Sequence, residues 1–323
     1  MAQTGDFGFV ARYQTIVLMT IALGAAALAW LLIFLGDWIG LWHWTHENRA
    51  FASDGAFLIW LFLILGQAAA WPIVAMIVIG KIREVDFYYK GNWREVVLSS
   101  FVFGGAALAI GISGIWVQDL PRWLPGFREK LTVLTVVGVG VALLPAIGIW
   151  RVQGALRELL DDLLRKKRND KKPDKLEIDR LLHMKDTLAL YLGFLGFLLT
   201  AAIVAAGAER KAVDAWGQRT NHHYNVDMVF PSDHVLLYGL LLTLLVSLVY
   251  APAHISYLAV GRRLRDDVVP MLPPSDPAWQ SRLGERASLE DVLDLRGKTD
   301  ANLKAAAAVV TPLIGSLIGL ING

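Results

Sequence analysis

The sequence contains no cysteine, which excludes disulfide bonds, thiolate catalysis and cysteine-ligated metal sites. It also lacks a glycine-rich phosphate loop, a Gly-x-Ser-x-Gly nucleophile elbow and a His-Glu-x-x-His zinc helix. No stretch between its apolar runs exceeds about 45 residues, which is too short for an ordinary independent soluble domain. These absences favour a protein that is not an enzyme, and the chain outside the apolar runs consists of short connecting segments.

Long apolar runs dominate the chain. A helix that spans a membrane needs about 20 mostly apolar residues, each adding 1.5 Å. Six runs reach this length, and a shorter seventh run, at 305–321, closes the chain; the six are 14–35, 56–80, 96–117, 131–150, 187–207 and 235–260. We therefore predict an all-α polytopic membrane protein, a bundle of six transmembrane helices plus a C-terminal membrane-embedded helix that either crosses or re-enters.

Ionisable residues are nearly missing from the six runs. Gln67 and His254 are the notable polar groups in them. We interpret His254 as a neutral histidine bonded to the backbone near Pro252. Ionisable residues inside spans usually mark pumps and transporters, so this scarcity argues against a proton- or sodium-coupled pump.

Basic residues predict the orientation of the spans, because Lys and Arg prefer cytoplasmic loops. Three connecting segments hold 22 Lys and Arg residues and the three alternating segments hold seven. The basic segments are 81–95, 151–186 and 261–301, and the others are 37–55, 118–130 and 208–234. We expect a plasma (inner) membrane protein with a cytoplasmic N-terminus, the second set of segments extracytoplasmic, and an uncleaved first span.

Three regions follow from this pattern: a six-span bundle at 1–260, a cytoplasmic linker at 261–301 and a membrane helix at 302–323. A cytoplasmic helical hairpin at 151–186 interrupts the bundle and breaks near Pro173. Its apolar stripe includes Leu156, Leu159, Leu160, Leu163 and Leu164. The stripe either packs within the protein or docks a cytoplasmic partner protein. Acidic residues intersperse the basic ones there, which argues against nucleic acid.

The linker at 261–301 contains four prolines between 270 and 277, which predict an extended path. Ser288 and Asp291 resemble a capping box that would start a short helix at 289–296. Gly297 would end this helix. We find no catalytic spacing in the linker.

Histidines and acids gather in two of the predicted extracytoplasmic loops. Imidazole and carboxylate groups are good ligands for zinc, copper or iron. If the two loops met, a divalent metal site could form, although the spacing matches no strong metal signature. The candidate ligands are His43, His46, Glu47, His222, His223, Asp227 and His234.

The C-terminal run carries glycines every fourth residue, which lets helix backbones approach closely. Thr311, Gly315, Ser316 and Gly319 would line or pack a central axis if copies of the chain associate around this helix. The sequence leaves three functions open. They are a homo-oligomeric channel or membrane-perturbing effector that needs no cofactor, a membrane enzyme or metal-binding protein with the extracytoplasmic His/Asp site, and a scaffold subunit of a larger membrane complex.

Overall fold

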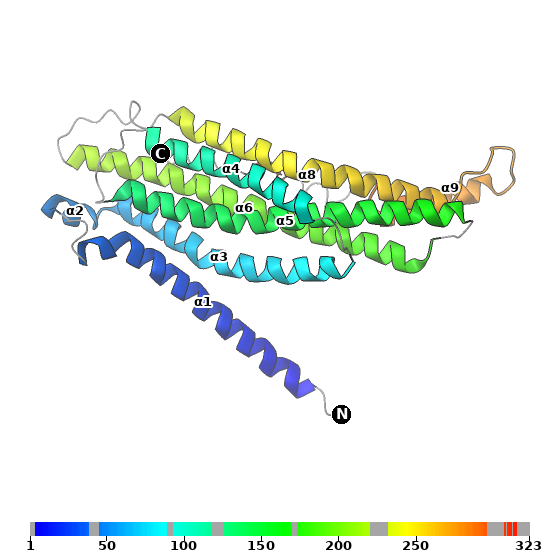
Figure 1. Cartoon of the computed structure of the whole chain (residues 1–323), viewed down its shortest axis with the longest axis horizontal. Coiled ribbons are helices and arrows are strands. Elements are labelled where there is room, and N and C mark those ends of the chain that lie inside the picture. The colour runs from blue at the N-terminus through cyan, green and yellow to red at the C-terminus, as the bar shows by residue number, and fades with distance from the viewer. Residues whose placement is uncertain are drawn as a thin grey trace.

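A computed structural model of the chain describes residues 4–38, 45–88, 93–117, 126–169, 173–219 and 232–295, with 307, 309–311 and 313–314. Within this part of the chain every regular element is a helix (Figure 1). The long helices are α1 (Thr4–Trp38), α3 (Gly55–Tyr88), α4 (Trp93–Val117), α5 (Phe127–Arg168), α6 (Lys175–Arg219) and α8 (Ser232–Val268), and the short ones are α2 (His46–Phe51) and α9 (Trp279–Val292).

The six long helices coincide with the six predicted runs, and each is long and apolar enough to cross a membrane. The predicted all-α class and the six spans are therefore confirmed at this level. The proposed seventh helix falls mostly on residues outside those that the structure describes. Its crossing of the membrane stays a prediction, and so does the division into three regions.

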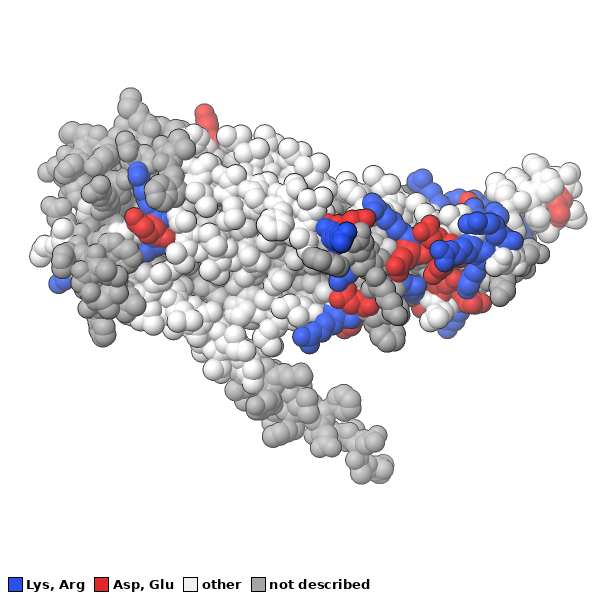
Figure 2. Space-filling model, in the orientation of Figure 1, with Lys and Arg blue, Asp and Glu red and all other residues white. Residues whose placement is uncertain are grey.

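Helices α5 and α6 extend well past their apolar runs. They contain 42 and 45 residues, which corresponds to about 63 and 68 Å, twice the roughly 30 Å hydrocarbon thickness of a bilayer. Figure 2 shows a broad surface without charged side chains and, to its right, a dense cluster of Lys, Arg, Asp and Glu. We call this the charged end of the bundle; it includes the end of α5, the start of α6, the end of α8 and α9. This distribution is consistent with a membrane-embedded bundle.

Helix α6 lies at the centre of the bundle, in contact with α3, α5 and α8. Its most apolar stretch is half buried, more than that of any other described span. The core divides into two clusters of buried side chains. One runs from the middle of the bundle to the charged end, and the other, around Phe51, Trp60 and Trp216, occupies the opposite end.

The apolar stripe at 151–186 faces the inside of the protein. Leu156, Leu159 and Leu163 are almost fully buried in the first cluster, together with Leu181 from α6. Leu160 packs against the same cluster. Most of the stripe is therefore occupied by internal packing, whereas Leu164 is exposed. The cytoplasmic partner stays a prediction.

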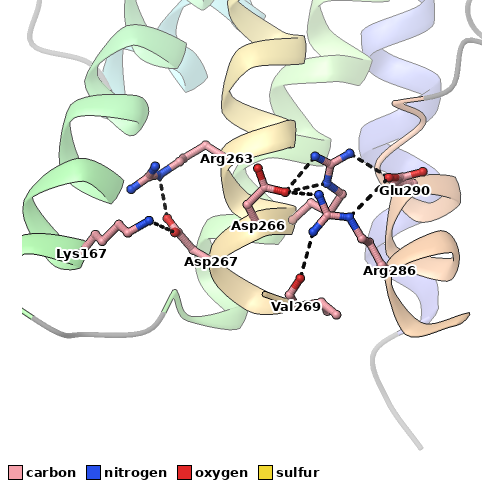
Figure 3. Close-up of polar contacts among 8 residues, drawn as sticks. Lys167, Arg263, Asp266, Asp267, Val269, Arg286 and Glu290 are labelled. Carbon is pink, nitrogen blue, oxygen red and sulfur yellow. Dashed lines mark hydrogen bonds and ion pairs between the residues drawn. The ribbon is translucent and has the colours of Figure 1, made fainter. Parts of the chain in front are cut away.

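Helix α9 has no fully buried residue, and ion pairs hold it to the end of α8 (Figure 3). Its Leu289 also packs against the first core cluster. Arg265 of α8 donates to Glu290 at 2.7 Å. Arg286 of α9 donates to Asp266 and, at 3.1 Å, to the carbonyl oxygen of Val269. A second group joins α8 to α5, because Asp267 lies 2.9 Å from Arg263 and 3.5 Å from Lys167.

The predicted short helix at 289–296 is displaced in the structure. Helix α9 begins at Trp279, directly after the prolines, and ends at Val292. Ser288 lies inside the helix, so the capping-box interpretation is wrong. The start is instead supported by Asp276, whose Oδ1 atom accepts the backbone N–H of Ala278 at 2.8 Å.

Helix α1 diverges from the bundle toward its N-terminus (Figure 1) and packs mainly on α3. Near its other end, Lys130 of α5 donates from Nζ to the carbonyl oxygen of Ile33 at 2.6 Å. Lys130 was expected in the loop at 118–130, but α5 begins at Phe127 and Lys130 is only 3% exposed. Its long side chain places the ammonium group against α1 from inside the core.

Candidate functional site

Glu209 lies in a helix of the bundle, although ionisable residues were expected to be nearly missing from the spans. The sequence placed it in a loop at 208–234, but α6 continues to Arg219 and includes it. Its helical face is shared with Ala205, Ala212, Val213 and Trp216, all of which are buried. The bundle therefore does carry an ionisable side chain on an inward-facing helix surface, at the end opposite the charged end.

Glu209 lines a partly enclosed cavity of about 190 Å³. Five helices contribute to its wall: α3, α4, α5, α6 and α8. The cavity extends from Trp60 to Trp71 along α3 and from Leu198 to Glu209 along α6. Eleven residues of helix correspond to about 16 Å, so the cavity reaches well into the bundle. Its wall draws residues from both core clusters, which places it where the two clusters meet.

Two polar side chains stand out against the largely apolar wall. Among the described residues, no hydrogen bond or ion pair reaches Glu209, and the Nε2 atom of Gln67 is buried without a hydrogen-bond partner. No Lys or Arg of the described chain lines the cavity. The buried Nε2 atom of Gln67 without a partner destabilises the fold by about 1–3 kcal/mol, whereas the side chain of Glu209 is half-buried. These two groups are therefore candidates to bind something that enters the cavity.

Small residues bring the helices around the cavity close together. A Cβ atom on Gly111 of α4 would lie 2.7 Å from the methyl carbon of Thr135 on α5. The two helices therefore approach so closely here that a side chain larger than glycine would clash. A Cβ on Gly138 would lie 3.2 Å from the ring of Trp71. All four residues line the cavity. The glycines thus set the width of the cavity as well as the packing of its wall.

His254 of α8 does not use the backbone partner that the sequence predicted. Its Nδ1 atom lies 3.2 Å from the hydroxyl of Tyr250, and the two rings stack with centroids 5.3 Å apart. The carbonyl oxygen of Pro252 accepts instead from Ser256 at 2.9 Å. His254 is thus part of an aromatic stack and is not among the residues that line the cavity.

The predicted metal ligands fall mostly outside the described residues; these are His43, His222, His223 and Asp227. His46 begins α2, followed by Glu47, and His234 lies in the first turn of α8. Within the described ranges, no group of three or more His, Asp or Glu is placed to hold a metal ion. The metal site stays a prediction.

The proposed pore residues are described only at Thr311, whose hydroxyl donates to the carbonyl oxygen of Ala307 at 2.6 Å. Gly315, Ser316 and Gly319 lie outside the described part of the chain. Nearby, Val309 packs against the first core cluster. The axial role of these residues stays a prediction.

Comparison with known proteins adds no relative. No family model, no curated protein and no solved structure matches this chain. The cavity and the residues around it are therefore the features of this chain that indicate a function.

Proposed function

We propose that this chain is an integral membrane protein that admits a small solute into its bundle at Glu209 and Gln67, and acts as a channel or carrier rather than as an enzyme. The observation that carries the proposal is a carboxylate without a described partner in the wall of a cavity between five spanning helices. Ionisable residues of spanning helices usually face the bundle interior or a water-filled cavity and mark solute or ion pathways.

The position of Glu209 supports access from water. Arg210 and Lys211 follow it directly, and α6 extends ten residues further to Arg219. Charged residues of this kind mark the boundary between hydrocarbon and water. Glu209 would then lie at the mouth of the cavity, with Gln67 further along the α3 wall.

Cysteine chemistry gives a direct test, because the natural chain contains no cysteine and a single introduced thiol reacts alone. Thr135 lines the cavity, while Val136, the next residue of α5, is 47% exposed on the outer surface of the bundle, where lipid would lie. Thr135→Cys and Val136→Cys thus form a matched pair at one depth. A thiol must ionise in water to react with a methanethiosulfonate.

We expect Thr135→Cys in membrane vesicles to react with a trimethylammonioethyl methanethiosulfonate about tenfold faster than Val136→Cys, or more. Reaction from one face only would indicate a carrier, and reaction from both faces a channel. Equal slow rates at the two positions would contradict the proposal, because the cavity would then be closed to water.

The other functions remain proposals without a supporting contact. A homo-oligomeric channel around 302–323 would place the pore outside this cavity, and a metal enzyme would use the loops at 37–55 and 208–234. A scaffold would use the charged end. Normal labelling at Thr135→Cys after removal of 302–323 would separate the bundle pathway from an axial pore.

A further inference from the structure

The chemistry of the cavity wall indicates which class of solute would bind. This inference rests on the proposed function. We propose that the site takes a small organic cation, a protonated amine or a quaternary ammonium, whose charge lies at Glu209 and whose apolar part fills the cavity. Four observations support this class: the charge of the wall, its aromatic side chains, its apolar remainder and its size.

The described wall of the cavity carries negative charge and no positive charge. Glu209 is the only carboxylate among the described lining residues, and none of those residues is basic. The buried ammonium of Lys130 donates to the carbonyl oxygen of Ile33 at 2.6 Å. The carboxylate of Glu209 is half-buried, and beside the low-dielectric protein an opposite charge attracts it more strongly than in bulk water. A cation in the cavity would supply the charge that the described wall lacks.

Two tryptophans of α3, Trp60 and Trp71, line the same cavity. Indole rings attract cations through their negative faces, and aromatic walls are the usual means of recognising quaternary ammonium groups. Most of the remaining wall is aliphatic, including Ile64, Leu134 and Leu199. Strongly hydrated metal ions are disfavoured by such a wall, because they require several oxygen ligands. An organic cation can place its charge beside Glu209 and the tryptophan rings and its apolar part against the aliphatic side chains of the wall.

The size of the cavity sets an upper limit on the solute. An apolar cavity of about 150 Å³ binds benzene, and this one measures about 190 Å³. It therefore has room for a ring of that size and a few further atoms. Larger solutes would have to displace the side chains around Gly111 and Gly138.

A matched ligand pair tests the charge preference directly. Phenyltrimethylammonium and tert-butylbenzene have the same heavy-atom skeleton and differ in a charged nitrogen against a neutral carbon. The readout is protection of Thr135→Cys from the methanethiosulfonate in lipid nanodiscs, plotted against the free aqueous concentration of each ligand. Val136→Cys reports any nonspecific effect of either ligand on the bilayer.

We expect phenyltrimethylammonium to protect Thr135→Cys at a free concentration at least about tenfold lower than the concentration of tert-butylbenzene that gives the same protection. Adding Glu209→Gln, which keeps the shape and removes the charge, should abolish this preference. Glu129→Gln is the control, because Glu129 is exposed near the start of α5, at the same end of the bundle. It should leave the preference unchanged.

Equal protection by the two ligands, or stronger protection by the neutral one, would overturn the cation assignment and would leave the solute pathway standing. A preference that survives Glu209→Gln would also overturn it. If Glu209→Gln does not fold, the ligand pair on the unaltered glutamate still decides the question. Failure of Thr135→Cys to react at all would instead contradict the proposed function.

Discussion

Gly148 of α5 lies directly against the ring of Tyr191 of α6. A Cβ atom on Gly148 would come within 2.5 Å of the Cε2 atom of Tyr191, which is fully buried. The tyrosine is fully buried in the first core cluster, so its ring could move away only by displacing its neighbours. The contact fixes how closely α5 and α6 pack on the charged-end side of the cavity.

Gly148→Ala should therefore destabilise the bundle by about 1–3 kcal/mol, the usual effect of overpacking a core. The measurement is thermal unfolding of the detergent-solubilised protein. Gly140→Ala is the matched control, because Gly140 lies on the same helix with no atom within 4 Å of its added Cβ. That variant should be as stable as the natural protein or more stable.

Tyr191→Leu in the Gly148→Ala background should recover part of the loss, since it removes the ring that the new methyl group meets. A Gly148→Ala protein that unfolds at the same temperature as Gly140→Ala would contradict the packing described for α5 and α6.

The sequence predicted the existence of the six long helices because their apolar runs match what a bilayer requires. The hairpin predicted at 151–186 already placed helix after Arg151 and a break near Pro173, and α5 ends at Arg168. The end of α6 was not predicted. Hydropathy falls after Gly207, but this stretch keeps good helix formers and an apolar stripe, so tertiary packing continues the helix to Arg219.

Glu209 was missed for the same reason. The spacing of apolar residues around Glu209 is that of one helix face, with Ala205, Ala212, Val213 and Trp216 three or four residues apart from it or from one another. If the predicted helix had been extended past 207, this spacing would have placed Glu209 on a buried face. No pattern in the sequence predicted the cavity. It depends on how five helices pack and on where their glycines meet other side chains, and neither follows from the pattern of one segment.

A second prediction concerns the attachment of α9. This helix has no fully buried residue, so apart from the packing of Leu289 against the first core cluster its position depends on ion pairs with α8. The double variant Asp266→Asn with Glu290→Gln should increase amide exchange in 279–292 by about tenfold, which corresponds to about 1.4 kcal/mol. Exchange in α3 and α6 should not change.

Glu285→Gln provides the comparison, because the pair of Arg282 and Glu285 joins two exposed residues of α9 and leaves α8 untouched. Its effect on exchange should be small. An equal rise in exchange in both variants would mean that α9 is marginal by itself and that the contacts with α8 do not hold it.

A third prediction concerns Asp294, which combines an unusual backbone with a buried ion pair. Its φ angle is 53°, it is 3% exposed, and its carboxylate lies 3.0 Å from Nζ of Lys185. Asp and Asn tolerate the left-handed region better than alanine. Asp294→Asn should reduce stability by about 1–3 kcal/mol through the lost charge, and Asp294→Ala by about 1 kcal/mol more.

Thermal unfolding of the two variants separates these contributions. The order should be natural protein, then Asp294→Asn, then Asp294→Ala. Identical midpoints for the two variants would show that the backbone conformation at 294 adds nothing to the effect of the ion pair.

A fourth prediction addresses the orientation of the bundle, which the basic residues suggest and no contact establishes. Lys175 begins α6 at the charged end, while Thr45 precedes α2 at the opposite end, and both are exposed. Without natural cysteines, Lys175→Cys and Thr45→Cys can each be labelled alone. A membrane-impermeant maleimide applied to intact cells should label Thr45→Cys and should reach Lys175→Cys only after lysis.

The reverse pattern would place the charged end outside and would turn the mouth of the Glu209 cavity toward the cytoplasm. The cavity would keep its shape and the carboxylate of Glu209 in its wall, but the solute would then enter from the cytosol. Labelling of Thr135→Cys from each face, compared with these two single-cysteine markers in vesicles of the same orientation, assigns the side from which the solute enters.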